Sequence, residues 1–139
     1  SGTAMKSDEC STLAELRRQV LEFRDRREWQ KFHNPKDLAL AMSIEVAEIL
    51  ELFRFKTVDE IRAELSAGPL AQQVGLELAD VLWWALLLSH EAGIDLAAAL
   101  EEKLALAERR YPVELARGRR LKYTELAAEA QTLPRCGDH

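Results

Sequence analysis

The sequence predicts an all-α fold, a four-helix bundle with short connections between its helices. Leu, Ala and Glu dominate the chain, and these residues favour helix over strand. Apolar residues recur at helical spacing, and the segments that carry them begin at typical capping residues. No alternating strand pattern reaches a useful length. With 139 residues and 47% hydrophobic content, the chain suits one domain with a sizeable core.

The first two helices are predicted over residues 13–32 and 35–55. The first follows a capping box made by Thr12 and Glu15, and apolar residues then recur at helical spacing. The second begins after Asn34, a good N-cap, and has a proline at its first helical position. We therefore expect two long helices joined by a very short connection.

The other helices follow without long gaps. A capping box opens a short helix over residues 57–68, and a third long helix runs over residues 69–93 to a glycine that can end it. Asp95 caps a fourth helix over residues 96–110. Residues 123–130 are expected to add another turn or two.

The sequence divides into one folded domain and two flexible ends. Residues 1–11 are interpreted as a tag-like, flexible N-terminal segment, and residues 127–139 as a flexible C-terminal tail. Residues 12–126 then form the helical domain, without internal repeats or low-complexity segments.

Charge and composition exclude several classes of partner. A net charge of −5 argues against binding to nucleic acid polymers, which usually requires a basic excess. The apolar run at residues 81–89 is far shorter than the ~20 residues of a membrane span, and no secretory signal is recognisable. Cys10 and Cys136 lack a metal-binding spacing and are interpreted as reduced thiols. We expect a cytoplasmic protein.

Four acidic residues interrupt the two most apolar helices. Glu45 and Glu48 lie three residues apart in one, and Glu77 and Asp80 repeat that spacing in the other. Residues at this spacing share a helix face, and Glu51 continues the first stripe. Buried carboxylates repel one another unless cations lie between them. Such hard oxygen ligands favour Mg²⁺, with Mn²⁺ as a substitute.

Two other interpretations of these carboxylates stay open. A di-iron bundle needs Glu-x-x-His on two helices, and here Glu51 and Asp80 occupy the histidine positions, which disfavours iron. The plainest alternative is a non-catalytic helical interaction module whose glutamates pair with lysines of a partner. Mg²⁺ would raise the thermal stability of a metal site but not of such a module.

Five short motifs follow one another between residues 13 and 126. They are REWQKFHNPKDL at residues 27–38, EVAEILELF at 45–53, ELAD at 77–80, RRYP at 109–112 and KYTEL at 122–126. Together they resemble the all-α NTP pyrophosphatase superfamily, the MazG-like enzymes, and most closely its dCTP pyrophosphatase branch.

The resemblance implies hydrolysis of a nucleoside triphosphate to the monophosphate and diphosphate. The branch points to dCTP or related dNTPs, including modified forms, and to house-cleaning of the nucleotide pool. Another nucleotide, such as dUTP or phosphoribosyl-ATP, remains an alternative substrate. By the same resemblance Glu45, Glu48, Glu77 and Asp80 bind Mg²⁺, and either Glu48 or Glu51 orients the attacking water.

The resemblance also assigns residues to the substrate. They are Trp29, His33, Phe55 and Trp84 around the base, and Lys36, Lys103, Arg110 and Tyr111 elsewhere on the nucleotide. Two positions depart from the family pattern: Ile44 replaces a glutamate, and Ala107 stands where an asparagine is common. Helices that are apolar on every side cannot be covered in so small a bundle, so we expect a homo-oligomer. The resemblance implies a dimer of dimers.

Overall fold

All regular elements in the computed structural model, which describes residues 7–132, are helices. In chain order they are α1 (Leu13–Asp25), the 3-10 turn η1 (Trp29–Phe32), α2 (Pro35–Phe53), α3 (Val58–Ala67), α4 (Leu70–Ala92), α5 (Leu96–Arg110), α6 (Val113–Ala116) and α7 (Tyr123–Thr132). The prediction of an all-α fold is thereby confirmed for the described residues.

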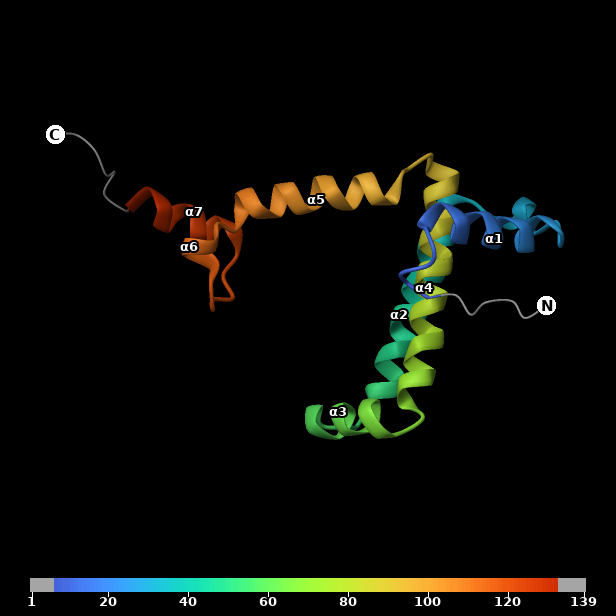
Figure 1. Ribbon diagram of the computed structural model, residues 1–139, viewed down its shortest axis with the longest axis horizontal. Coiled ribbons are helices and arrows are strands. Elements are labelled where there is room, and N and C mark those ends of the chain that lie inside the picture. Colours follow the sequence, from blue (N-terminus) through green and yellow to red (C-terminus); the bar gives the residue numbers. More distant parts are fainter. Residues whose placement is uncertain (1–6, 133–139) are drawn as a thin grey trace. The chain divides into compact units, whose positions relative to one another are not determined.

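The chain forms two compact units, Ser1–Ile94 and Asp95–His139, and each is described by itself. In the first unit α2 and α4 run side by side in opposite directions, with α3 between them in sequence (Figure 1). Helix α1 packs across the part of α4 near its C-terminal end, at the end of the pair opposite α3 (Figure 1). The prediction of one four-helix bundle is met in part. Helices α1, α2 and α4 belong to the first unit, whereas α5 belongs to the second.

The predicted caps form as local hydrogen bonds. At four helix starts a side-chain oxygen accepts from the backbone N–H three residues on: Thr12 from Glu15 at 3.1 Å, Asn34 from Asp37 at 2.9 Å, Thr57 from Glu60 at 3.2 Å and Asp95 from Ala98 at 2.9 Å. At the end of α4, Gly93 adopts a left-handed φ of 66°, which a residue without Cβ adopts at no steric cost.

Two helices end earlier than predicted. The first stops at Asp25 and not near residue 32, because Glu28 has a left-handed φ of 54° and the chain then turns into η1. The Arg27 guanidinium donates to the carbonyl oxygen of Phe23 at 3.0 Å, which helps to close the last turn. Helix α2 likewise ends two residues early, since Phe55 has a φ of 64°.

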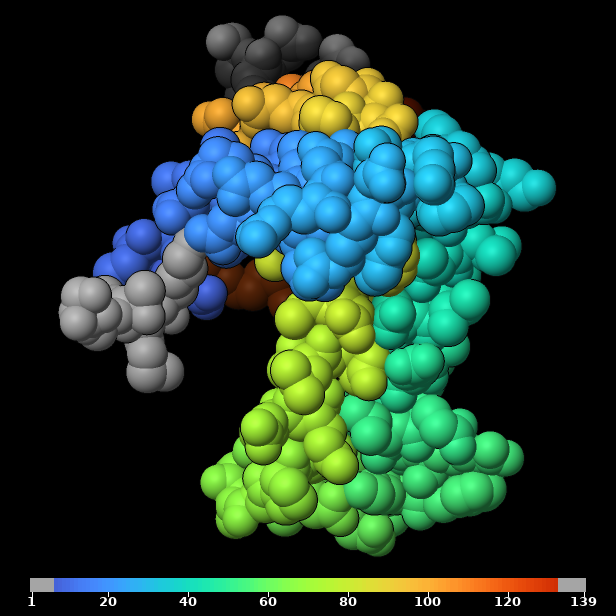
Figure 2. Space-filling view, turned by 90° about the vertical axis from the view of Figure 1, so that its right-hand side faces the viewer, coloured from blue at the N-terminus to red at the C-terminus, as the bar shows by residue number. Residues whose placement is uncertain are grey.

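Few apolar side chains among residues 7–132 are buried. They are Leu38, Leu70, Leu86 and Leu87 in the first unit and Leu126 in the second. Leu50 of α2 and Leu76 of α4 remain 65% and 63% exposed, which agrees with the expectation that one small bundle cannot cover helices apolar on every side. Figure 2 shows that α1 covers one end of the α2–α4 pair and leaves the rest of it open on that face.

The second unit contains α5, α6 and α7. Arg119 donates to both carboxylate oxygens of Glu129 on α7, at 2.6 and 2.5 Å, which fixes the loop before this helix. The pair lowers the pKa of Glu129 by direct hydrogen bonding. Helix α7 continues to Thr132, so the expected C-terminal tail begins inside a helix. Residues 1–6 and 133–139 lie outside the described range.

No single helix in the described range is long and apolar enough to cross a membrane. One broken pair, α4 with α5, reaches the required length and composition only when both are taken together.

Candidate metal centre and aromatic cavity

Three of the four predicted metal ligands lie together. Glu45 and Glu48 project from α2, and Glu77 projects from the neighbouring α4. Each offers one carboxylate oxygen, and these three oxygens lie within 4.8 Å of one another. The pairing of α2 with α4 therefore converts two sequence spacings into one cluster.

The fourth predicted ligand, Asp80, lies one turn after Glu77 on α4. It is outside the three-oxygen cluster but lines a cavity together with Glu45. Burial raises the pKa of Asp80, and the negative charge of Glu45 raises it further. Asp80 thus adds a fourth negative charge beside the cluster.

Glu77 carries the clearest sign of an electrostatic conflict. Its pKa is raised from 4.5 to about 7, first by burial, then by the hydrogen bond and charge of Glu48, and then by Glu45 and Asp80. Its Oε2 atom is buried without a hydrogen-bond partner in the described part of the protein. A cation would supply the missing partner and remove the repulsion. This donor set, all oxygen, fits a hard divalent ion such as Mg²⁺.

Glu51 has a different environment from the cluster. Its side chain is exposed, and its Oε1 atom accepts from Arg54 at 3.4 Å. It lies three residues after Glu48 on α2 but is not one of the three clustered carboxylates. The geometry places Glu48 nearer to the other carboxylates, and Glu51 one turn away on the same face.

A cavity of about 280 Å³ adjoins the carboxylates. Its lining combines aromatic rings with charged groups: Phe23, Arg24, Trp29, His33, Glu45, Asp80, Trp83 and Trp84. Three of the four side chains expected around the base, those of Trp29, His33 and Trp84, therefore line one cavity with two of the expected metal ligands. Aromatic walls combined with a few charged groups are typical of small-molecule sites.

The surroundings of His33 in this cavity disfavour a positive charge on its ring. Burial lowers its pKa, and the charge of Arg24 lowers it further, against the opposing effect of Glu91. The ring lies edge-on to Trp84, with centroids 5.8 Å apart, and its Nδ1 atom is buried without a hydrogen-bond partner in the described residues. A neutral imidazole with a free nitrogen can make a hydrogen bond to a ligand.

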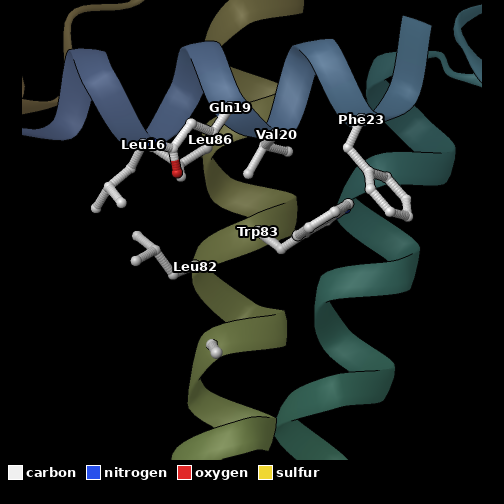
Figure 3. Close-up of a pocket in the computed structure, with 8 residues that line it drawn as sticks. Leu16, Gln19, Val20, Phe23, Leu82, Trp83 and Leu86 are labelled. Atoms are coloured by element: carbon white, nitrogen blue, oxygen red, sulfur yellow. The ribbon is translucent and has the colours of Figure 1, made fainter. Parts of the chain in front are cut away.

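Aromatic side chains in edge-on contact form another part of the cavity wall. Phe23 contacts Trp29 and Trp83 edge-on, at centroid distances of 5.8 and 5.1 Å, and the Arg27 guanidinium lies 3.5 Å from the Phe23 ring centroid. Phe23 and Trp83 also border a second, apolar groove of about 260 Å³ between α1 and α4 (Figure 3). These two rings therefore separate the aromatic cavity from the apolar groove.

Of the other five predicted substrate residues, two lie in the first unit but do not line this cavity, and three belong to the second unit. Phe55 is 90% exposed, ten residues beyond Glu45, with Arg54 lying over its ring at 4.6 Å. Lys36 is exposed in the first turn of α2. The others, Lys103, Arg110 and Tyr111, belong to the second unit. There Arg110 lies 4.6 Å from the ring centroid of Tyr123 and borders a separate cavity of about 330 Å³.

Arg24 is a cavity residue that the sequence reasoning missed. It is 6% exposed, the one buried side chain with a full charge among residues 7–132. A signal existed in the sequence, because Arg24 follows Val20 by four residues and so lies on the apolar face of α1. A cation on an apolar helix face requires a partner, and Glu91 on α4 provides one.

Known proteins resemble this chain in sequence and in structure. The MazG-like family model matches residues 40–126. The human protein named dCTP pyrophosphatase 1 is 39% identical over 115 residues, which make up 83% of this chain and 68% of that protein. Its bovine counterpart is 37% identical over 115 residues. A solved pyrophosphatase from Archaeoglobus fulgidus DSM 4304 matches with a TM-score of 0.67 and 38% identity, over 80% of this chain and 99% of that one.

Proposed function

This chain belongs to the MazG-like family, and from that premise we propose that it is a Mg²⁺-dependent nucleoside triphosphate pyrophosphatase. Its substrate is dCTP or a related dNTP, including modified forms, and its products are the monophosphate and diphosphate. The reaction would remove unwanted nucleotides from the pool. We assign it to residues 12–126. The observation that carries the proposal is the cluster of Glu45, Glu48 and Glu77 beside an aromatic cavity.

The four carboxylates have the role of holding the metal. Glu45, Glu48 and Glu77 would bind Mg²⁺ or Mn²⁺ directly, with Asp80 beside them. When bound, such an ion supplies charge neutralisation for the phosphates and makes a coordinated water more acidic. The raised pKa of Glu77 and its buried Oε2 atom support this role, since both reflect negative charge that lacks a counterion.

The chain's own carboxylates also handle the proton of the reaction. A water oxygen bonds to the α-phosphorus, and the bond between this phosphorus and the α–β bridging oxygen breaks. Diphosphate leaves with that oxygen and the electron pair of the broken bond. The proton released by the water passes to a carboxylate oxygen of Glu48 or of Glu51. Glu51 is exposed and bound only loosely by Arg54, so it is free to accept that proton.

The aromatic cavity is the proposed site of the base. Trp29, His33 and Trp84 offer ring faces and edges, and the uncharged His33 ring offers Nδ1 for a hydrogen bond to an edge of the base. Phe55 remains a proposed aromatic contact and Lys36, Lys103, Arg110 and Tyr111 remain proposed contacts on the strength of the family resemblance alone.

The assembly proposed for this enzyme is a dimer of dimers. Large apolar side chains on α2 and α4, including Leu40, Leu50, Leu76 and Leu78, are more than half exposed in the single chain. Exposed apolar surface in this amount usually marks an interface. A second copy of the chain packed against α2 and α4 would cover these residues and complete a helical bundle.

Diphosphate release from a panel of dNTPs and NTPs tests the function, with Mg²⁺ and then with a chelator. We expect release that requires Mg²⁺ and is strongest with dCTP. Glu77→Gln should lower turnover by about a hundredfold or more, because it removes one charged group of the site. Glu60→Gln on exposed α3 is the matched control and should retain full activity. Release that survives the chelator, or an active Glu77→Gln variant, would reject the assignment.

A further inference from the structure

We propose that Arg24 is a positioning residue for the nucleotide cavity, which it shapes by tying the end of α1 to the end of α4. The inference rests on the proposed function, because the cavity is read as the site of the base. Arg24 is neither one of the proposed metal ligands nor one of the aromatic side chains proposed to contact the base.

The contacts of Arg24 join two helices that are far apart in sequence. Its Nε and Nη2 atoms both lie 2.8 Å from Oδ1 of Asp25, and its Nη1 atom lies 3.3 Å from Oε1 of Glu91 on α4. Asp25 and Glu91 are themselves 54% and 30% exposed at the side chain, whereas that of Arg24 is only 7% exposed. The arginine is thus the inner member of the network, and the two acids face outward.

The position of Arg24 makes this network part of the cavity wall. Helix α1 ends one residue after Arg24, and the chain then turns through η1 to Trp29 and His33. All three side chains border the same cavity. The turn that presents Trp29 and His33 therefore starts from the point where Arg24 fixes α1 to α4.

The charge of Arg24 acts on the same wall. Arg24 from α1, Glu45 from α2 and Asp80 from α4 line the same cavity as His33, and the charges of Arg24 and Glu91 act on its imidazole. Arg24 disfavours a second positive charge on the neighbouring imidazole. Its planar, forked guanidinium can bind two acids at once, which a lysine ammonium cannot do in the same geometry.

Arg24→Met and Arg24→Lys test the proposal in the 139-residue chain. For Arg24→Met we expect the KM for dCTP to rise about tenfold while kcat stays within about twofold, since the cavity changes and the carboxylates do not. Arg24→Lys should raise the KM less than Arg24→Met does. Arg18→Met is the matched control, because Arg18 is an exposed arginine of the same helix, paired with Glu22 at 2.8 Å, and it should behave as the wild type.

A second measurement does not depend on catalysis. Calorimetric titration of dCMP into the protein with a chelator present should show about tenfold weaker binding for Arg24→Met than for Arg18→Met. If Arg24→Met does not fold, Glu91→Ala replaces it, because Glu91 is partly exposed and its loss frees Arg24 from α4. It should weaken dCMP binding in the same direction by about threefold.

The outcomes separate this inference from the proposed function. A lower melting temperature and lower kcat with unchanged KM and dCMP affinity would mean that Arg24 only supports the fold, and would overturn the inference while the function stands. A wild type that binds dCMP but releases no diphosphate, together with weaker binding by Arg24→Met, would support the inference and reject the catalytic function. A wild type that neither binds nor hydrolyses would reject both.

Discussion

The indole nitrogen of Trp84 lies 3.4 Å from Oε1 of Glu45, so the aromatic cavity and the carboxylate cluster share a long hydrogen bond. Trp84 belongs to α4 and Glu45 to α2. The contact means that the ring next to the proposed base also orients an oxygen of the proposed metal site. A ligand that shifts one group must affect the other.

Trp84→Phe removes this hydrogen bond and keeps an aromatic ring. We expect the Mg²⁺ concentration for half-maximal activity to rise about threefold, because Glu45 loses the donor that orients it. Kinetic titration with Mg²⁺ measures the change. Trp83→Phe is the control, because Trp83 contacts the ring of Phe23 and, among the described residues, donates no hydrogen bond to a carboxylate of the cluster. Equal Mg²⁺ requirements in the two variants would show that the contact has no effect on the site.

The pH dependence of stability should reveal Glu77. Its pKa is 4.5 ordinarily and about 7 in the folded protein. Between these values the metal-free folded protein keeps a proton that the unfolded chain has released. The free energy of unfolding should therefore fall as the pH rises from 4.5 to about 7. Asp80 shifts in the same direction.

Thermal melts in chelator and in Mg²⁺ check this expectation. The gain in Tm from Mg²⁺ should grow with pH over the same window, because the ion replaces a proton. Glu77→Gln should flatten the dependence, and the exposed Glu60→Gln should preserve it. A Mg²⁺ gain that is constant across the window would contradict the assigned cluster.

Glu48 and Glu51 should respond differently to substitution. Glu48→Gln should weaken Mg²⁺ binding and lower kcat together, since Glu48 is a member of the cluster. Glu51→Gln should lower kcat by about a hundredfold without changing the Mg²⁺ requirement if Glu51 accepts the proton of the attacking water. Isothermal titration with Mg²⁺ beside steady-state kinetics distinguishes the two. Full activity of Glu51→Gln would assign the proton to Glu48.

Leu50→Glu tests the proposed assembly. Leu50 is 65% exposed in the single chain, and a charge placed there would be buried in an apolar interface at a cost of several kcal/mol. Light scattering coupled to gel filtration should report a tetramer for the wild type and a smaller species for the variant. Glu60→Lys also changes the charge on the surface and should leave the tetramer intact. A monomeric wild type would exclude the proposed dimer of dimers.

The parts of the structure that depend on neighbouring residues could be predicted from the sequence. The caps at Thr12, Asn34, Thr57 and Asp95 form as expected because each needs only a side chain and an N–H three residues away. The carboxylate pairs were equally visible, since helical spacing fixes which residues share a face. Three of the four carboxylates came together in one cluster once α2 and α4 paired.

The remaining features depend on contacts between distant segments. The break at Glu28 has no glycine or proline to announce it, and the burial of Arg24 depends on Glu91, which lies 67 residues away. The exposure of Phe55 could not be read from helical spacing, which does not say how many helices cover a face. The residues of α5 and beyond belong to a second unit, so no spacing rule relates them to the carboxylates.

A single rigid element carries both halves of the proposed site. Glu77 and Trp84 are seven residues apart on α4, which corresponds to about 10 Å along a helix axis. That separation cannot change without breaking helical hydrogen bonds, so α4 fixes the distance between an anionic group and a ring. A molecule whose ring and charged end do not match this length must leave one of the two contacts unmade.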